Sequence, residues 1–435
     1  MKALDFSRPL EVITLSISKI DDLGCTDSVN QRFWIINTCF LLPSPLEMFD
    51  CLTLRMLVTL SESFWKAEYW LPPGYTWADL EDADGIIYPH PKDLLATIPL
   101  TFVLTIIRYV FERTIALPLG RAMGVRDPIR IKATPNPILE SFFWNKNRNP
   151  KEDELNHLAS QCGLTVRQTQ CWFRYRRNQE RPLVSKKFSE ACWRLSFYSS
   201  TFFGGFFIFY NKTWFSEPET IWNGYPKQPL QLTIYWWYLM ELSFYCSLLL
   251  TLIFDVKRSD FREHVIHHFL SITLLSFSYC SNFVRIGAMV LLLHDASDIF
   301  LESCKMFVYA QWKQIQYIAF ALFALVFFVN RLILFPVKTI YTSFLVFQTK
   351  NQFFFGYYFS IALLILVQCL NIYWSSLIAK AFCKILADGQ LKNDLRSDVE
   401  EEYMSDEKSA VKQQNKERLK SNDITGTRAR KPTYH

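Results

Sequence analysis

The chain lacks the residue spacings that build metal centres and disulfide frameworks. Its 11 cysteines form no CxxC pair and no other regular spacing. This pattern excludes the common structural zinc sites and the disulfide scaffold of a small secreted protein. The seven histidines are too few for the several histidine boxes of a membrane di-iron enzyme. No clear signal peptide is present, because the apolar stretch at residues 33–42 is short and follows acidic residues.

Apolar and aromatic residues are abundant. Half of the chain is hydrophobic, with 38 Phe, 13 Trp and 20 Tyr among 435 residues, a level that soluble domains of this length rarely reach. The net charge of +6 is too small to indicate a partner. We therefore predict an all-α, polytopic membrane protein with about seven transmembrane helices and a small helical, homeobox-like cytosolic insert.

Hydropathy divides the chain into an ordered series of spans and polar segments. The expected spans are residues 94–117, 193–210, 232–254, 261–282, 284–306, 315–337 and 355–386. We predict five regions: an unassigned N-terminal extension (1–55), a lumenal segment with the first span (56–120), the homeobox-like domain (121–190), the main membrane domain (191–386) and a disordered tail (387–435).

The basic residues of the loops indicate the orientation. They gather within residues 121–187, 257–262, 305–313 and 380–384, which all fall on one side of the membrane if there are seven spans. Because Lys and Arg favour the cytosolic side, the N-terminus is expected in the lumen and the tail in the cytosol.

Two polar patches interrupt the apolar stretches. One reads HVIHH at residues 264–268, and the other reads HDASD at residues 294–298. Together they hold four of the seven histidines. Ionisable side chains inside a bilayer are costly, so such patches indicate a functional site.

Helix rise places the two patches at one depth. His267 lies roughly 15 Å along the fourth span from Lys257, and His294 lies roughly 16 Å from the exit of the antiparallel fifth span near Lys305. The patches can therefore face one another across a cavity that opens to the cytosol.

The second patch presents its acids at helical spacing. His294, Asp298 and Glu302 recur every four residues and lie near one helix face, and Asp295 is rotated by about 100° but stays beside the same cavity wall. Imidazoles beside carboxylates suit proton transfer, and an imidazole nitrogen can also accept an acyl group. The alternatives are a bridge between helices and a divalent metal ion held by His264, His268 and an acid.

Residues 128–182 contain the helical stretch PKEDELNHLASQCGL, a break, and then TVRQTQCWFRYRRNQERP. The second part resembles the recognition helix of a homeodomain, with Trp172, Phe173 and Arg177 at the usual spacing. Tyr175 stands where homeodomains carry the adenine-reading Asn, and the segment is short for three full helices. We therefore expect a helix-turn-helix-like module whose arginines meet phosphates or lipid head groups, and Tyr175 argues against DNA binding.

Long strings of the chain resemble the ceramide synthases, which belong to the TRAM-Lag1-CLN8 (TLC) group of membrane proteins. The strings include FWKAEYWLPPGYTWADLEDADG, WNGYPKQP, DVKRSDFREHVIHHF and LLLHDASDIFLESCKMF. HPKDLLA and GQLKNDLRSDVEE are most similar to the ceramide synthase 4 type.

The resemblance implies a sphingoid base N-acyltransferase (EC class 2.3.1) of the endoplasmic reticulum membrane. It would transfer a long-chain acyl group from acyl-CoA to sphinganine or sphingosine, with acyl-CoA as co-substrate, no cofactor, and a homo- or hetero-dimer as the expected assembly. The functional residues of the family correspond to His267, His268, His294, Asp295 and Asp298. His264 is extra to that pattern.

The resemblance also suggests where the substrate lies. A loop before the last span, at about residues 342–352, would select the acyl length, here with the apolar run Phe344, Leu345, Val346 and Phe347. We expect the CoA phosphates near Lys257, Arg258 and Arg262. Two other classes of function stay open: a non-enzymatic lipid sensor or translocon-associated protein on the same fold, and a membrane-tethered transcription regulator.

Three positions are candidates for modification. Ser397 and Ser405 precede acidic residues in the tail at the spacing that acidophilic kinases prefer. Asn211 begins an NKT glycosylation sequon on the expected lumenal side.

Overall fold

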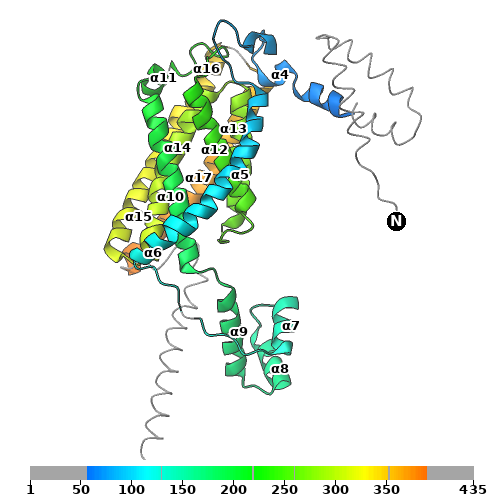
Figure 1. The fold of residues 1–435 in the computed structure, drawn as a ribbon, viewed down its shortest axis with the longest axis vertical. Helices are drawn as coiled ribbons and strands as arrows, with labels where there is room; N and C mark the ends of the chain where they lie inside the picture. The colour runs from blue at the N-terminus through cyan, green and yellow to red at the C-terminus, as the bar shows by residue number, and fades with distance from the viewer. Residues whose placement is uncertain (1–55, 129, 218–219, 259, 351–352, 389–435) are drawn as a thin grey trace, which may run out of the picture. The chain divides into compact units, whose positions relative to one another are not determined.

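The computed structural model describes residues 56–388 apart from 129, 218–219, 259 and 351–352 (Figure 1). The expected extension at residues 1–55 and the tail at residues 389–435 lie outside this part of the chain. Two compact units are distinguished, one up to Trp70 and the other from Leu71 onward. In the first unit, α4 (Ala67–Trp70) ends on Trp70, whose indole N–H donates to the Phe64 carbonyl at 2.8 Å.

The second unit begins with two tight turns that lead into the first long helical rod. The turns are η1 (Trp77–Leu80) and η2 (Pro91–Ala96), and the rod is formed by α5 (Thr97–Phe111), η3 (Glu112–Ala116) and α6 (Leu117–Ala122). Pro91 opens η2, where its missing N–H costs nothing, and the Asp93 carboxylate accepts the backbone N–H of His90 at 2.9 Å.

Six further rods complete the bundle in Figure 1. They are α10 (Val184–Phe209), α12 (Leu232–Thr251), α13 (Phe261–Cys280), α14 (Val284–Tyr309), the continuous run of α15 (Lys313–Phe327), η5 (Phe328–Tyr341) and α16 (Thr342–Lys350), and α17 (Phe355–Asp388). A short helix, α11 (Thr213–Ser216), follows α10. Apart from one isolated β-bridge between Ala83 and Ile86, the regular secondary structure of the described residues is all helical. The predicted all-α class is confirmed.

Three of the rods are long and apolar enough to cross a membrane: Pro91–Ala122, Lys313–Leu345 and Phe355–Ala387. The other four coincide with the expected spans but carry more polar residues within the part of the chain that is described. One of them, α10, starts at Val184 rather than at the expected residue 193, so it also includes charged residues such as Glu190.

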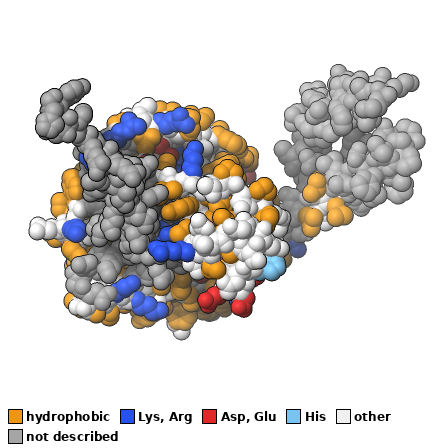
Figure 2. Space-filling view, turned by 90° about the horizontal axis from the view of Figure 1, so that it is seen from below, with side chains coloured by type: hydrophobic (Ala, Val, Ile, Leu, Met, Phe, Trp, Pro, Cys, Tyr) orange, Lys and Arg blue, Asp and Glu red, His pale blue; other side chains and the backbone are white. Residues whose placement is uncertain are grey.

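Packing places α14 at the centre, against α10, α13, α15 and η5. Between α10 and α12 the rings of Phe197 and Phe244 stack at a centroid distance of 3.6 Å, and such van der Waals packing holds helices together in a membrane. Large apolar side chains such as Phe102 and Ile106 of α5 point outward. Figure 2 shows apolar side chains over the flanks and Lys and Arg side chains on the face turned to the viewer, as expected for helices that contact lipid.

The homeobox-like region forms three helices, α7 (Pro137–Asn145), α8 (Glu152–Cys162) and α9 (Val166–Glu180). The expectation that it is too short for three was wrong. The missed helix, α7, has a clear start signal: the Asn136 side chain accepts the N–H groups of Ile138 and Leu139, and Pro137 is the first helical residue. A separate core closes the region, formed by Leu139, Phe143, Leu155, Leu158, Trp172 and Phe173.

Candidate active site

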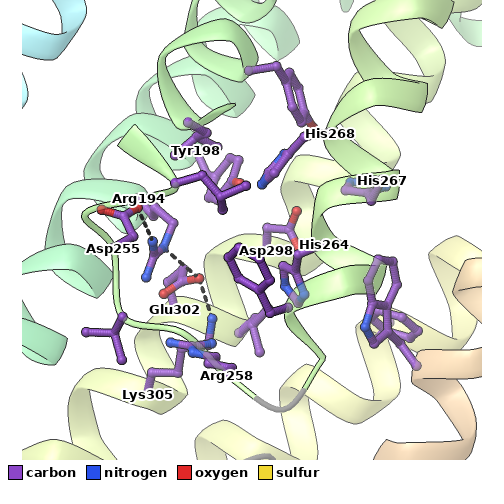
Figure 3. A pocket seen from close by; sticks show the side chains of 18 of the residues that line it. Arg194, Tyr198, Asp255, Arg258, His264, His267, His268, Asp298, Glu302 and Lys305 are labelled. Carbon is purple, nitrogen blue, oxygen red and sulfur yellow. Dashed lines mark hydrogen bonds and ion pairs between the residues drawn. The ribbon is translucent and has the colours of Figure 1, made fainter. Parts of the chain in front are cut away.

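A polar cavity of about 120 Å³ lies within the bundle (Figure 3). Imidazoles of α13 line one side, and acids of α14 line the other. Its titratable lining residues are Arg194, Tyr198, Tyr245, Asp255, Arg258, His264, His267, His268, Asp298, Glu302, Lys305 and Arg331. The fold therefore brings the three histidines of the first polar patch and Asp298 of the second around one space.

The histidines of α13 present ring nitrogens to this cavity. The Nδ1 atoms of His267 and His268 are buried and have no hydrogen-bond partner among the described residues. The ring centroids of the two histidines are 5.8 Å apart, and Tyr245 lies 6.4 Å and 6.2 Å from them. Because buried polar atoms are normally paired, these nitrogens are suited to meet a substrate group.

His264 lines the same cavity, although the sequence analysis set it aside. Its Nδ1 lies 2.9 Å from the carbonyl oxygen of Asp260 and 3.3 Å from the Asp260 carboxylate. The ring also packs 5.3 Å from Trp374. His264 therefore lines the cavity, and one of its ring nitrogens already contacts Asp260 at the start of the same helix.

The three expected residues of α14 enter three different environments. Asp298 lines the polar cavity. His294 lines a second, apolar cavity, and its Nδ1 lies 2.8 Å from the Val290 carbonyl while its buried Nε2 has no partner among the described residues. Asp295 is fully buried and lines neither cavity.

Asp295 therefore departs from the expectation that it lies beside the cavity wall. Its carboxylate accepts the Thr201 hydroxyl of α10 at 3.0 Å, and it also contacts Glu241 of α12. The rotation of about 100° per residue carries it past the cavity edge and into the interface of α10, α12 and α14. In this place it holds helices together behind His294.

Arg331 supplies a cation that the sequence analysis missed. It is buried in η5, and its guanidinium donates to the Asp298 carboxylate at 2.7 Å, the Ser297 hydroxyl at 2.7 Å and the His294 carbonyl at 3.2 Å. The surrounding π-helix contains Pro336, and π-helical turns are frequent at functional sites. The signal was present, because Arg331 is an ionisable residue inside an apolar stretch.

The second cavity is apolar and adjoins the first at His267 and Tyr245, which line both. Apart from these and His294, its walls are mainly aliphatic and aromatic: Leu274, Leu275, Phe283, Ile286, Val290, Leu291, Leu364 and Val367. The pair of cavities thus joins a charged chamber to an apolar one, with an imidazole at the junction. Such a junction fits a ligand with a polar head and a long apolar chain.

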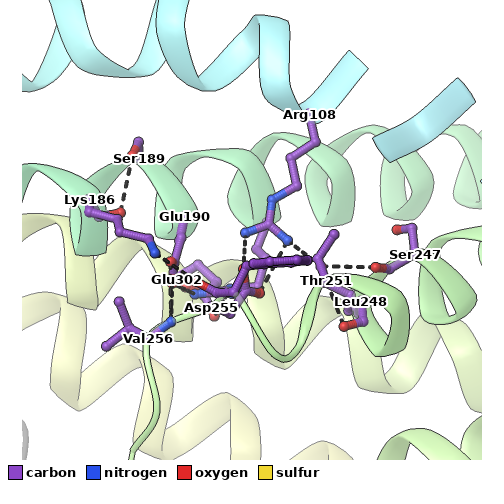
Figure 4. Close-up of polar contacts among 12 residues, drawn as sticks. Arg108, Lys186, Ser189, Glu190, Ser247, Leu248, Thr251, Asp255, Val256 and Glu302 are labelled. Atoms are coloured by element: carbon purple, nitrogen blue, oxygen red, sulfur yellow. Dashed lines mark hydrogen bonds and ion pairs between the residues drawn. The ribbon is translucent and has the colours of Figure 1, made fainter. Parts of the chain in front are cut away.

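A network of buried ion pairs closes the charged end (Figure 4). Asp255 accepts from Arg108 at 2.6 Å and lies 3.9 Å from Arg194. Glu302 lies 3.3 Å from Arg194 and accepts from Lys305 at 2.5 Å. These contacts connect α5, α10, α14 and the segment between α12 and α13.

The three residues expected to bind the CoA phosphates do not all line the polar cavity. Arg258 lines the polar cavity, whereas Lys257 and Arg262 are exposed and do not line it. The ammonium of Lys257 lies 5.5 Å from the Phe261 ring centroid. One expected cation therefore reaches the chamber, together with Arg194 and Lys305.

Comparison with known proteins identifies the family. A model described as TLC domain matches residues 187–380, and a homeodomain model matches residues 130–182. Ceramide synthase 4 of Mus musculus is 53% identical over 352 residues, which cover 81% of this chain and 90% of the relative. Ceramide synthase 4 of Homo sapiens is 50% identical (82% and 91% covered), and human ceramide synthase 3 is 45% identical (80% and 90% covered).

The chain belongs to the ceramide synthase family. It is a membrane protein with helical spans, and the resemblance read from its sequence is confirmed, including the similarity to ceramide synthase 4.

In this member of the family, the segment expected as an acyl-length loop is helical. Residues 342–350 form α16, which continues the rod of α15 and η5. Phe344 and Leu345 are exposed, and Phe347 is buried. No property of the Val346 side chain is described.

Three candidates for modification and the arginines of the homeodomain-like region remain. Asn211 is exposed between α10 and α11, and Ser397 and Ser405 lie outside the described residues. In the homeodomain-like region, Arg176 binds Glu140 and Glu180 and Arg177 donates to the Arg148 carbonyl. No group of three His, Cys, Asp or Glu side chains that could hold a metal ion occurs within the described ranges.

Proposed function

We propose that this protein is a sphingoid base N-acyltransferase that transfers a long-chain acyl group from acyl-CoA to sphinganine or sphingosine. Membership of the ceramide synthase family supports this reaction class. The structural observation that carries the proposal is the position of His267 and His268 where a charged cavity meets an apolar one.

The two cavities fit the two ends of an acyl-CoA. The acyl chain lies in the apolar cavity, where each buried methylene contributes about 0.8 kcal/mol. The phosphates of CoA lie at the charged end, where Arg258, Arg194 and Lys305 supply positive charge. The thioester then lies beside His267, the histidine that both cavities share.

The reaction requires a proton to leave the amine. The amine nitrogen attacks the thioester carbonyl, a C–N bond forms, the C–S bond breaks, CoA leaves as the thiol, and one proton of the original ammonium passes to solvent. His267 or His268 takes the proton of the amine as a general base, or first receives the acyl group itself. Asp298, held by Arg331, balances the charge that develops on the imidazole.

We also propose that the protein lies in the membrane of the endoplasmic reticulum, with all seven rods crossing the bilayer, the N-terminus in the lumen, and the homeodomain-like region and tail in the cytosol. The one-sided loop charge supports this orientation. Treatment of the expressed protein with an endoglycosidase tests it, because a mobility shift that Asn211→Gln abolishes places the α10–α11 connection in the lumen. Glycosylation of a sequon engineered into residues 257–262 would show that this segment is lumenal and would contradict the proposed orientation.

N-acylation by microsomes that contain the protein tests the roles of His267 and His268. His267→Ala and His268→Ala should each abolish transfer from a panel of acyl-CoA substrates to sphinganine, measured by lipid mass spectrometry at equal protein level. His157→Ala is the matched control, because His157 is exposed on α8. Full activity of both cavity variants would reject the assignment, and binding of acyl-CoA without turnover by the unmodified protein would favour a lipid sensor.

A further inference from the structure

One end of the apolar cavity is remote from the histidines. Phe283 and Gly287 line it on the α14 side, and Tyr238 and Ser278, which hydrogen-bond to each other, line it on the side of α12 and α13. A Cβ atom at position 287 would collide with this Tyr238–Ser278 pair. Phe283 lies 11 residues before His294, or roughly 16 Å of helix, so the cavity runs along α14 from an imidazole to an aromatic ring.

Phe283 belongs to an aromatic cluster beyond this end. Its ring centroid lies 5.6 Å from Trp222, 5.2 Å from Tyr225, 6.0 Å from Phe347 and 6.4 Å from Phe354. Of these five described rings, Phe283 is the one that also lines the cavity. Phe347 of α16 therefore contacts Phe283 but does not itself line the cavity.

We propose that Phe283 limits the length of the acyl chain that the cavity accepts, with Phe347 setting the position of its ring from behind. This inference rests on the proposed function, because it requires the acyl chain to occupy the apolar cavity. The Phe283 ring is 4% exposed and packed on several sides, so it cannot swing away without disturbing the cluster. A chain that is too long must therefore displace the ring or leave methylenes outside the cavity.

A graded series at position 283 tests the proposal in microsomes that contain the full chain. With an acyl-CoA panel and sphinganine, Phe283→Leu and Phe283→Ala should shift the preferred acyl length upward in that order, and Phe283→Trp should shift it downward. A single methylene in an apolar pocket changes selectivity by roughly tenfold or more, so the ratio of long to preferred products should change by at least that factor in Phe283→Ala.

Two further variants separate this effect from loosening of the cluster. Phe353→Ala removes a nearby ring that packs against Tyr357 at 5.9 Å and does not line the cavity, and it should keep the acyl preference of the unmodified protein. Phe347→Ala removes support behind Phe283 and should shift the preference in the same direction as Phe283→Ala, by a smaller factor.

The outcomes separate the two proposals. An unmodified protein that acylates sphinganine while every position-283 variant keeps the same acyl preference overturns the role of Phe283 and leaves the proposed function intact. Loss of all activity in Phe283→Leu, Phe283→Ala and Phe283→Trp at normal protein level also overturns it, because the ring would then serve the chemistry or the fold. An unmodified protein inactive with every acyl-CoA refutes the proposed function itself.

Discussion

At the scale of single residues, Arg331 organises the acid face of the candidate site. Its guanidinium bonds Asp298, Ser297 and the His294 carbonyl at once, which fixes one turn of α14 relative to η5. The planar fork of an arginine can meet several acceptors in fixed directions, whereas a lysine ammonium is a point charge on a flexible stem. The charge alone is therefore not the property that this position needs.

Arg331→Lys should lower kcat for N-acylation on the order of a hundredfold, because a small misplacement of catalytic groups has an effect of this size. The KM for acyl-CoA should change little, because Arg331 lies on the acid side of the chamber. Steady-state kinetics with sphinganine measure both constants. Arg285→Lys, near the start of α14, is the control, and an equal fall in both variants would contradict a special role for Arg331.

At the scale of elements, the homeodomain-like region carries its own start signals and its own core. Thr165 accepts the backbone N–H of Gln168 at the start of α9, and the Gln168 side chain accepts the backbone N–H of Thr165, a capping box. The indole N–H of Trp172 donates to the Thr134 carbonyl at 2.6 Å, which ties α9 to the segment ahead of α7. These local devices indicate that the region folds as an independent element.

Trp172→Ala should lower the free energy of unfolding of an isolated 128–182 fragment by about 3–5 kcal/mol, the usual effect of truncating a buried aromatic ring. Trp144→Ala, in the same fragment, should have little effect because Trp144 is 58% exposed. Thermal unfolding followed by circular dichroism compares the two. Similar losses in both variants would show that the region does not fold around the core described above.

The turn at η1 provides a pH-dependent element. The Asp79 carboxylate accepts the Thr76 backbone N–H and the Lys227 ammonium, both at 2.9 Å, and these bonds lower the pKa of Asp79 to about 2 from 3.8. Since the folded pKa is the lower one, the contribution of Asp79 to stability is complete above about pH 4 and disappears as the pH falls through 2.

The Tm difference between the unmodified protein and Asp79→Asn should therefore stay constant above about pH 4 and shrink toward pH 2. Tryptophan fluorescence of the detergent-purified proteins during heating measures it. A difference that grows as the pH falls would contradict the sign of the effect.

At the scale of the whole bundle, buried charges connect segments that are far apart in the sequence. Arg108 of α5 binds Glu112 and, 147 residues away, Asp255. The side chain of Arg108 is 8% exposed and that of Asp255 is 13% exposed, so neither charge is well solvated. Removing one partner of such a pair leaves the other buried and uncompensated, whereas removing both can be nearly neutral.

Arg108→Leu should destabilise the bundle by about 3–5 kcal/mol, and addition of Asp255→Leu should recover part of that loss. Arg113→Leu, one turn further along the same rod at an exposed position, should cost less than about 1 kcal/mol. Thermal aggregation of the detergent-solubilised proteins ranks the four chains. A double variant less stable than Arg108→Leu would contradict the pairing.

The sequence was sufficient for features that depend on neighbouring residues. Hydropathy located all seven rods, and the costly HVIHH and HDASD patches located the histidines of both cavities. It was less accurate at helix ends, because α10 begins at Val184 rather than at residue 193, and the rod expected to end at residue 337 continues through α16. Arg331 and Glu241 are ionisable residues within apolar runs, yet neither was predicted as a site residue, because nothing local states which partner such a residue meets.

The sequence by itself therefore determined the membrane class, the order of the rods, the family and most of the side chains that can take part in the chemistry. Tertiary structure alone decided how each rod is rotated and which distant residues it meets. It turned Asp295 toward Thr201, brought Arg331 to Asp298, and placed Phe283 between Phe347 and the apolar cavity. The physical reason is that helix formation follows from bonds and hydropathy within a few residues, whereas rotation and contact follow from the packing of side chains supplied by the whole bundle.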